Sequence, residues 1–240
     1  GLSLDPAVLA NNPLNIIGMT ALILLLKLGK LLVLLAVPLW MLFVAAQWVD
    51  FLWAGLVILG IEKVRLIENF LGVSPLDLYY MPYSHSLPSA VLLSLLAGVI
   101  AALVLKSHRT AIVLAVAATA FSHWLFDLIV HREDLPLWFD EMKVGFGLWQ
   151  FPFVSVPTEI GLMLLGVWVY DRAQPSPTRA GTIALWAFGF AMASLQVQNT
   201  FFNKHPTSPE GFAQLSLFGY LTLTVLAAGV DYLRKEKRPS

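Results

Sequence analysis

Cysteine is absent from this sequence, and charged residues are scarce. Without cysteine the chain can form neither a disulfide nor a thiolate metal site. Charged residues make up 12% of the 240 residues, whereas soluble domains carry about 25%. The formal net charge is zero, so the chain lacks the basic surface of a nucleic-acid-binding protein, and we expect no nucleic-acid partner. The low charge instead favours a protein embedded in a lipid bilayer.

Long apolar runs account for the high hydrophobic content of 58%. A helix needs about 20 apolar residues to cross a bilayer. The runs predict an all-α integral membrane protein, a bundle of about seven transmembrane helices (six to eight). The expected spans cover residues 14–36, 38–61, 85–105, 110–130, 151–170, 181–199 and 212–232.

A single transmembrane helical domain is the simplest division of the chain. It would cover residues 14–233, with an N-terminal tail at 1–13 and a basic cytoplasmic tail at 234–240. With seven spans, most lysines and arginines fall on the side that holds the C-terminus. The positive-inside rule therefore predicts a cytoplasmic C-terminus and an N-terminus outside.

Residues 122–131 (SHWLFDLIVH) close an apolar run that carries no charge from Ala111 to Asp127. His123, Asp127 and His131 are spaced i, i+4, i+8, which places them along one helix face. Two imidazoles and a carboxylate form a ligand set for zinc or manganese. Ionisable groups inside a membrane span favour a functional role. The alternative is a hydrogen bond between an imidazole and Asp127 that joins two helices.

Three further ionisable residues stand in or beside apolar segments. His85 follows Pro82 at the mouth of the third span and could bind a metal, or bond to loop backbone. Asp50 lies among apolar residues of the second span and must be paired or protonated, as a ligand or a catalytic base. Glu159, about two turns into the fifth span, is a candidate catalytic base, or it bonds a neighbouring helix.

With seven spans, these groups all fall in the outer half of the bundle. We find no comparable set in the cytoplasmic half, so the sequence predicts a site near the outer leaflet. Residues 132–134 (RED) are expected to form a solvated face.

Five short segments resemble a family of uncharacterised bacterial inner-membrane proteins that are often labelled membrane-bound metal-dependent hydrolases. A distant group of that family is the LexA-binding inner-membrane hydrolase-like proteins. The segments are residues 45–50 (AAQWVD), 75–77 (PLD), 83–86 (YSHS), 122–127 (SHWLFD) and 131–136 (HREDLP).

The resemblance implies a bacterial inner-membrane location and a divalent metal site, whose ligands would be Asp50, His85, His123, Asp127 and His131. One position departs from the family pattern. Where the family has Gly-His near the N-terminus, this chain has Gly18-Met19, and a thioether is a poor ligand for zinc or manganese.

Three functions are compatible with these observations. The first is a metal-dependent hydrolase, or a degenerate relative, acting on an ester or phosphoester of a lipid-like substrate. The second is a non-enzymatic accessory subunit that packs against other membrane proteins or pigments; Met19 and the nearly uncharged helices favour it. The third is a transporter in which His123 and Asp127 relay protons.

Overall fold

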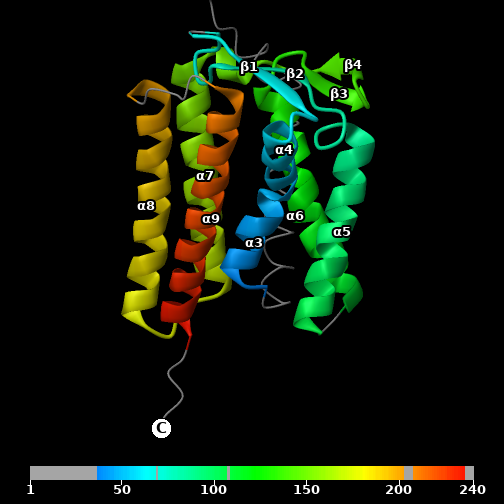
Figure 1. The fold of residues 1–240 in the computed structure, drawn as a ribbon. Coiled ribbons are helices and arrows are strands. Elements are labelled where there is room, and N and C mark those ends of the chain that lie inside the picture. Colours follow the sequence, from blue (N-terminus) through cyan, green and yellow to red (C-terminus); the bar gives the residue numbers. More distant parts are fainter. Residues whose placement is uncertain (1–36, 69, 107–108, 203–207, 236–240) are drawn as a thin grey trace, which may run out of the picture.

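The computed structural model describes residues 37–235, apart from residue 69 and residues 107–108 and 203–207. The expected first span (14–36), the N-terminal tail and Met19 lie outside the described residues. Most of the described chain is helical (Figure 1).

Five helices are long and apolar enough to cross a membrane. They are α5 (Leu87–Leu105), α6 (Arg109–Val130), α7 (Pro152–Ala173), α8 (Arg179–Phe201) and α9 (Pro209–Arg234). Two shorter helices, α3 (Leu39–Ala46) and α4 (Trp48–Ile58), meet at a 50° bend and together could form a sixth crossing. The mainly helical fold is confirmed, and the structure is consistent with a multi-pass membrane protein. The span count stays a prediction.

The helix boundaries follow ordinary capping chemistry. Thr178 and Ser208 precede α8 and α9, and each side-chain oxygen accepts a hydrogen bond from the N–H three residues on, which satisfies one free donor of the first turn. Pro38 directly precedes α3, where the sequence suggested a break. The bend after α3, at Gln47, was not predicted.

Two antiparallel β-hairpins are the main departure from an all-helical chain. Strands β1 (Lys63–Leu66) and β2 (Leu76–Tyr80) pair in one, and β3 (Leu135–Trp138) and β4 (Glu141–Val144) in the other. A short 3₁₀ helix, η1 (Leu148–Gln150), follows β4. Both hairpins lie at the same end of the bundle, opposite the end at which α9 (Pro209–Arg234) finishes (Figure 1). Strands β1 (KVRL) and β4 (EMKV) alternate polar and apolar residues. Such alternation indicates a strand, but over only four residues it is too weak to predict one.

Helices α5 and α6 pack closely enough for backbone contact. A Cβ added at Gly98 of α5 would lie 2.4 Å from the carbonyl oxygen of Val113 in α6. Small buried residues, including Ala97 and Ala101 on α5 and Ala115 on α6, line the contact. Because the two helices are sequential and antiparallel, this contact brings the start of α5 beside the end of α6.

A group of paired polar residues lies at the end of the bundle away from the two hairpins. Arg234, which was assigned to the basic tail, is instead the buried last residue of α9. Its guanidinium pairs with Asp171 at 3.1 Å. Asp231 accepts hydrogen bonds from the backbone N–H of Trp40 and the hydroxyl of Tyr170. The interpretation that only one half of the bundle carries such groups was therefore incomplete.

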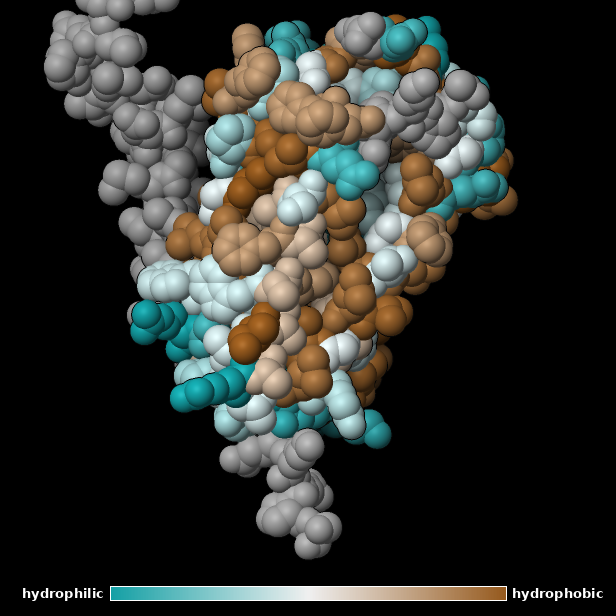
Figure 2. All heavy atoms as spheres, turned by 90° about the vertical axis from the view of Figure 1, so that its left-hand side faces the viewer, coloured by the Kyte–Doolittle hydropathy of each residue, from teal (hydrophilic) through white to brown (hydrophobic). Residues whose placement is uncertain are grey.

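The outer surface of the helices is strongly apolar. On the face seen in Figure 2, hydrophobic side chains cover much of the middle, and hydrophilic ones gather toward the ends. Exposed residues such as Phe190, Phe218 and Val225 lie on α8 and α9. This distribution fits helices surrounded by lipid tails.

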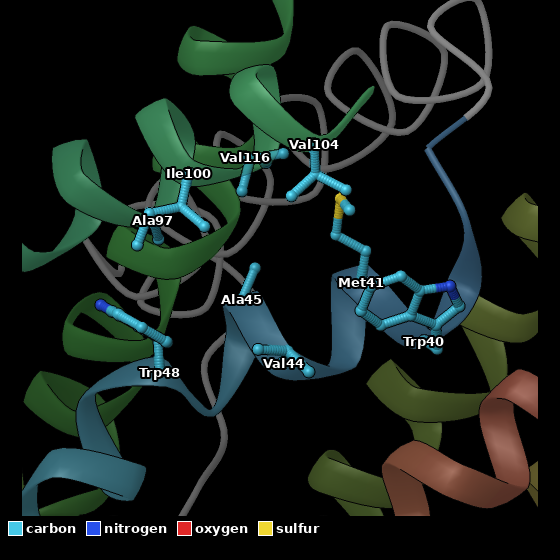
Figure 3. A pocket seen from close by; sticks show the side chains of 10 residues that line it. Trp40, Met41, Val44, Ala45, Trp48, Ala97, Ile100, Val104 and Val116 are labelled. Atoms are coloured by element: carbon cyan, nitrogen blue, oxygen red, sulfur yellow. The ribbon is translucent and has the colours of Figure 1, made fainter. Parts of the chain in front are cut away.

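A small apolar hollow of about 100 Å³ lies between α3, α5 and α6 (Figure 3). Its walls include Met41, Ala45, Ile100 and Val116. Among the described residues that line it, none is titratable, so it is separate from the site described below.

Candidate metal centre

Three segments far apart in the sequence bring a compact group of histidines and aspartates together. Asp50 projects from α4, His85 lies in the turn before α5, and His123 and Asp127 lie one turn apart on α6. One ligand atom each from Asp50, His85 and His123 lies within 4.8 Å of the others. The i, i+4 spacing predicted that His123 and Asp127 share one helix face. The packing of the helices brings Asp50 and His85 beside them.

The four side chains alternate nitrogen and oxygen donors at short distances. His85 Nε2 lies 3.3 Å from Asp50 Oδ1 and 3.6 Å from Asp127 Oδ2. His123 Nε2 lies 3.4 Å and 3.2 Å from the same two oxygens. Tetrahedral zinc ligands at about 2.0–2.2 Å from the ion are about 3.3–3.6 Å apart. Four of the six edges of such a tetrahedron are thus already close to their required length.

Asp127 supplies a second indication that the group fits a cation. Its Oδ2 is buried and accepts no hydrogen bond, although it faces both imidazoles. A buried carboxylate oxygen without a partner costs free energy. A divalent ion bound by Oδ2 would remove that cost, so the donor set and its burial fit zinc or manganese.

Groups behind the four side chains hold them in place. Tyr220 of α9 donates a 3.0 Å hydrogen bond to Asp50 Oδ2, which leaves Oδ1 facing the imidazoles. Ser84 Oγ lies 2.7 Å from His85 Nδ1. Such outer partners orient the ligands of metal sites.

His131, proposed from sequence as a ligand, lies beside the cluster rather than within the group of three. Its Nε2 is 3.8 Å from Asp127 Oδ1, and its Nδ1 is 2.9 Å from Asp134 Oδ1. Its ring packs against Trp149, with centroids 5.0 Å apart. Burial alone would lower the pKa of His131, but the hydrogen bond with Asp134 and the charge of Asp127 outweigh it, so this pKa is raised.

Glu159, the other proposed catalytic residue, is engaged elsewhere. Its carboxylate accepts hydrogen bonds from Ser155 Oγ, from Trp149 Nε1 at 3.1 Å and from Gln196 Nε2 at 2.5 Å. Gln196 belongs to α8, so Glu159 joins α7 to α8. This geometry matches the interhelical alternative, and Glu159 contributes no ligand atom to the cluster of Asp50, His85 and His123.

The segment 132–134 forms the expected solvated face only in part, since Glu133 is exposed and Arg132 partly exposed. Asp134 is buried, at 4% exposure, and holds His131. Arg132 pairs with Asp134 at 3.2 Å and also with Asp77 of β2. The β1–β2 hairpin is thereby tied to the end of α6 that carries the cluster.

Sequence reasoning missed Glu62, Ser84, Asp134 and Tyr220 as supporting residues. Asp134 had a local signal, since it follows His131 by three residues. Tyr220 had no such local signal, because it lies 170 residues from Asp50. The two residues come into contact through the packing of α9 on α4.

No protein-family model, curated protein or solved structure matches this chain. The family resemblance therefore stays an expectation, and the site rests on its own geometry. In that geometry one ligand atom each of Asp50, His85 and His123 could hold a divalent ion, and Asp127 Oδ2 lies 3.6 Å and 3.2 Å from the two imidazoles. Among the four side chains, Asp50 and His123 are the most exposed, at 18% and 15%. A reactant would therefore approach from their side.

Proposed function

We propose that this protein is a membrane-embedded, metal-dependent hydrolase. Zinc or manganese would be held by Asp50, His85, His123 and Asp127. The observation that carries the proposal is the set of four distances of 3.2–3.6 Å that join His85 Nε2 and His123 Nε2 to Asp50 Oδ1 and Asp127 Oδ2. Asp127 Oδ2 is buried and accepts no hydrogen bond.

The proposed setting is the bacterial inner membrane. Residues 14–36, the bent α3–α4 pair and the five long helices would make seven spans, with the N-terminus outside and the C-terminus cytoplasmic. Support comes from the length and apolarity of the helices and from the distribution of basic residues. The site would then lie near the outer leaflet.

A bound metal would lower the pKa of a coordinated water molecule toward 7, so that hydroxide is available near neutral pH. The protein's own groups would do the rest. His85 and Asp127 are the least exposed of the four and would shield the buried side from bulk water. Tyr220 keeps Asp50 Oδ1 turned toward the imidazoles. The substrate would be an ester or phosphoester on a lipid-like molecule, because the site opens among membrane helices.

A hydrolysis assay tests this proposal. Protein purified in mild detergent would be stripped with chelator, reloaded with zinc or manganese, and offered carboxylic esters and phosphoesters of short-chain and lipid alcohols. We expect hydrolysis only after reloading, and its loss in Asp50→Asn. Equal rates in stripped and reloaded protein, or an active Asp50→Asn variant, would contradict the proposal. Metal binding without hydrolysis would favour the accessory-subunit hypothesis.

A further inference from the structure

A buried chain of hydrogen bonds runs behind His85. Ser84 Oγ lies 2.7 Å from His85 Nδ1 and 2.6 Å from Glu62 Oε2. Glu62 Oε1 accepts the backbone N–H groups of Tyr83 and Ser84 at 2.8 Å and 2.9 Å. Glu62, Ser84 and His85 are 1%, 0% and 4% exposed. Bulk water therefore contributes little to these bonds, and the three side chains must satisfy one another.

Counting the available protons fixes the direction of each bond. A carboxylate has no proton to donate, and a serine hydroxyl has only one. The hydroxyl proton of Ser84 is directed to Glu62 Oε2. The contact between Ser84 Oγ and His85 Nδ1 therefore needs the ring N–H as its donor. His85 must carry a proton on Nδ1.

With the proton on Nδ1, the other ring nitrogen of His85, Nε2, is unprotonated in the neutral ring. In the neutral ring, Nε2 presents its lone pair to Asp50 Oδ1 at 3.3 Å and Asp127 Oδ2 at 3.6 Å. Three electron-rich atoms converge on one point, which is an arrangement that a cation stabilises. The opposite tautomer, with the proton on Nε2, would place a hydrogen where that cation belongs.

We propose that Glu62 and Ser84 are positioning residues that hold His85 in the Nδ1–H tautomer, so that Nε2 is always the metal-binding atom. The inference rests on the proposed metal centre for its purpose. Partners of this kind raise the affinity of a metal site by about 10–100-fold. Glu62 directly precedes β1, so the segment that leads into the β1–β2 hairpin helps to position His85.

Replacing Glu62 with Gln should reverse the tautomer. The side-chain oxygen of Gln would accept the two backbone N–H groups that Glu62 Oε1 accepts now. Its NH₂ group would then face Ser84 Oγ and donate to it. The Ser84 hydroxyl would be released to donate to His85 Nδ1, which moves the ring proton to Nε2.

Nitrogen-15 NMR of metal-free, histidine-labelled protein in detergent micelles reads the tautomer directly. We expect a protonated Nδ1 on His85 in the unaltered protein and in Glu141→Gln, whose side chain is exposed on β4, and a protonated Nε2 in Glu62→Gln. The His85 signals are assigned by substituting each of the five histidines in turn. A wild-type ring protonated on Nε2, or an unchanged tautomer in Glu62→Gln, would overturn the proposal.

Zinc affinity gives the second readout. Ser84→Ala should weaken zinc binding about 10–100-fold. Ser94→Ala is the matched control, since Ser94 is also buried but its hydroxyl donates to the carbonyl oxygen of Ala90 in its own helix. Equal affinities in the two variants would overturn the positioning role. A protein that binds no zinc but keeps the expected tautomers would instead contradict the proposed function.

Discussion

Asp127 shows at the scale of one residue why the cluster is better suited to a metal than to a purely structural role. Its Oδ1 faces His131 and its Oδ2 faces two imidazoles, yet Oδ2 accepts no hydrogen bond. A carboxylate that merely joined two helices would be expected to have its buried oxygens satisfied. Glu159 offers the comparison, because both its oxygens accept hydrogen bonds.

Asp127→Asn should therefore weaken zinc binding by more than about 100-fold, beyond the loss expected from an outer partner. The zinc-induced change is compared within each protein, because in chelator the variant already lacks the carboxylate charge that faces His85 Nε2 at 3.6 Å and His123 Nε2 at 3.2 Å. Added zinc at 100 times the Kd should stabilise the unaltered protein by about 2.7 kcal/mol and the variant hardly at all. Thermal unfolding in detergent, with and without zinc, measures both. An equal zinc-induced rise in Tm in both proteins would contradict this role for Asp127.

The sequence could predict only those parts of the site that lie close together along the chain. His123 and Asp127 share a helix face because of the 3.6-residue period. Asp50 and His85 were grouped with them by the expected topology and by the family resemblance, and their meeting depends on how α4 packs against α5 and α6. Glu62 was missed, since its partners are 21 and 22 residues away. Arg234 was misplaced because a basic residue at a chain end suggests a solvated tail.

At the scale of elements, the packing of α5 on α6 brings His85 to His123. Gly98 permits this approach, because any Cβ there would strike the backbone of Val113 at 2.4 Å. Backbone atoms cannot turn aside as a side chain can. The two helices would have to separate, and the start of α5 would move relative to the end of α6.

Gly98→Ala should destabilise the protein by about 1–3 kcal/mol, the usual cost of overpacking, and should also weaken zinc binding. Gly166→Ala is the control, since nothing lies within 4 Å of a Cβ added at Gly166 of α7. It should be neutral or stabilising by up to about 1 kcal/mol, because alanine favours a helix more than glycine does. Thermal unfolding and zinc titration of both variants provide the check. If Gly98→Ala behaves like Gly166→Ala, the contact does not position the site.

The helices and the hairpins differed in how well they could be predicted. The five long helices each hold an 18-residue apolar window, and such windows are a strong signal. The hairpin strands have only four or five residues, and pairing between them is decided by contacts such as Arg65 with Asp77. Asp77 also pairs with Arg132, which links the β1–β2 hairpin to the end of α6.

At the scale of the whole molecule, two polar regions occupy opposite ends of an apolar bundle. In the region around Asp171 and Arg234, the carboxylate of Asp171 accepts hydrogen bonds from Arg234 of α9 and Trp186 of α8. The region around Asp50 and Asp127 has converging donor atoms and one unsatisfied oxygen. This difference supports structural pairing at one end and metal binding at the other.

Metal content is the most direct test of that assignment. Protein purified in mild detergent without chelator would be analysed by mass spectrometry, beside His123→Ala and Arg234→Met. We predict about one zinc or manganese ion per chain in the unaltered protein and in Arg234→Met, and none in His123→Ala. No bound metal in the unaltered protein, or equal metal in His123→Ala, would contradict the assignment of this cluster as a metal centre.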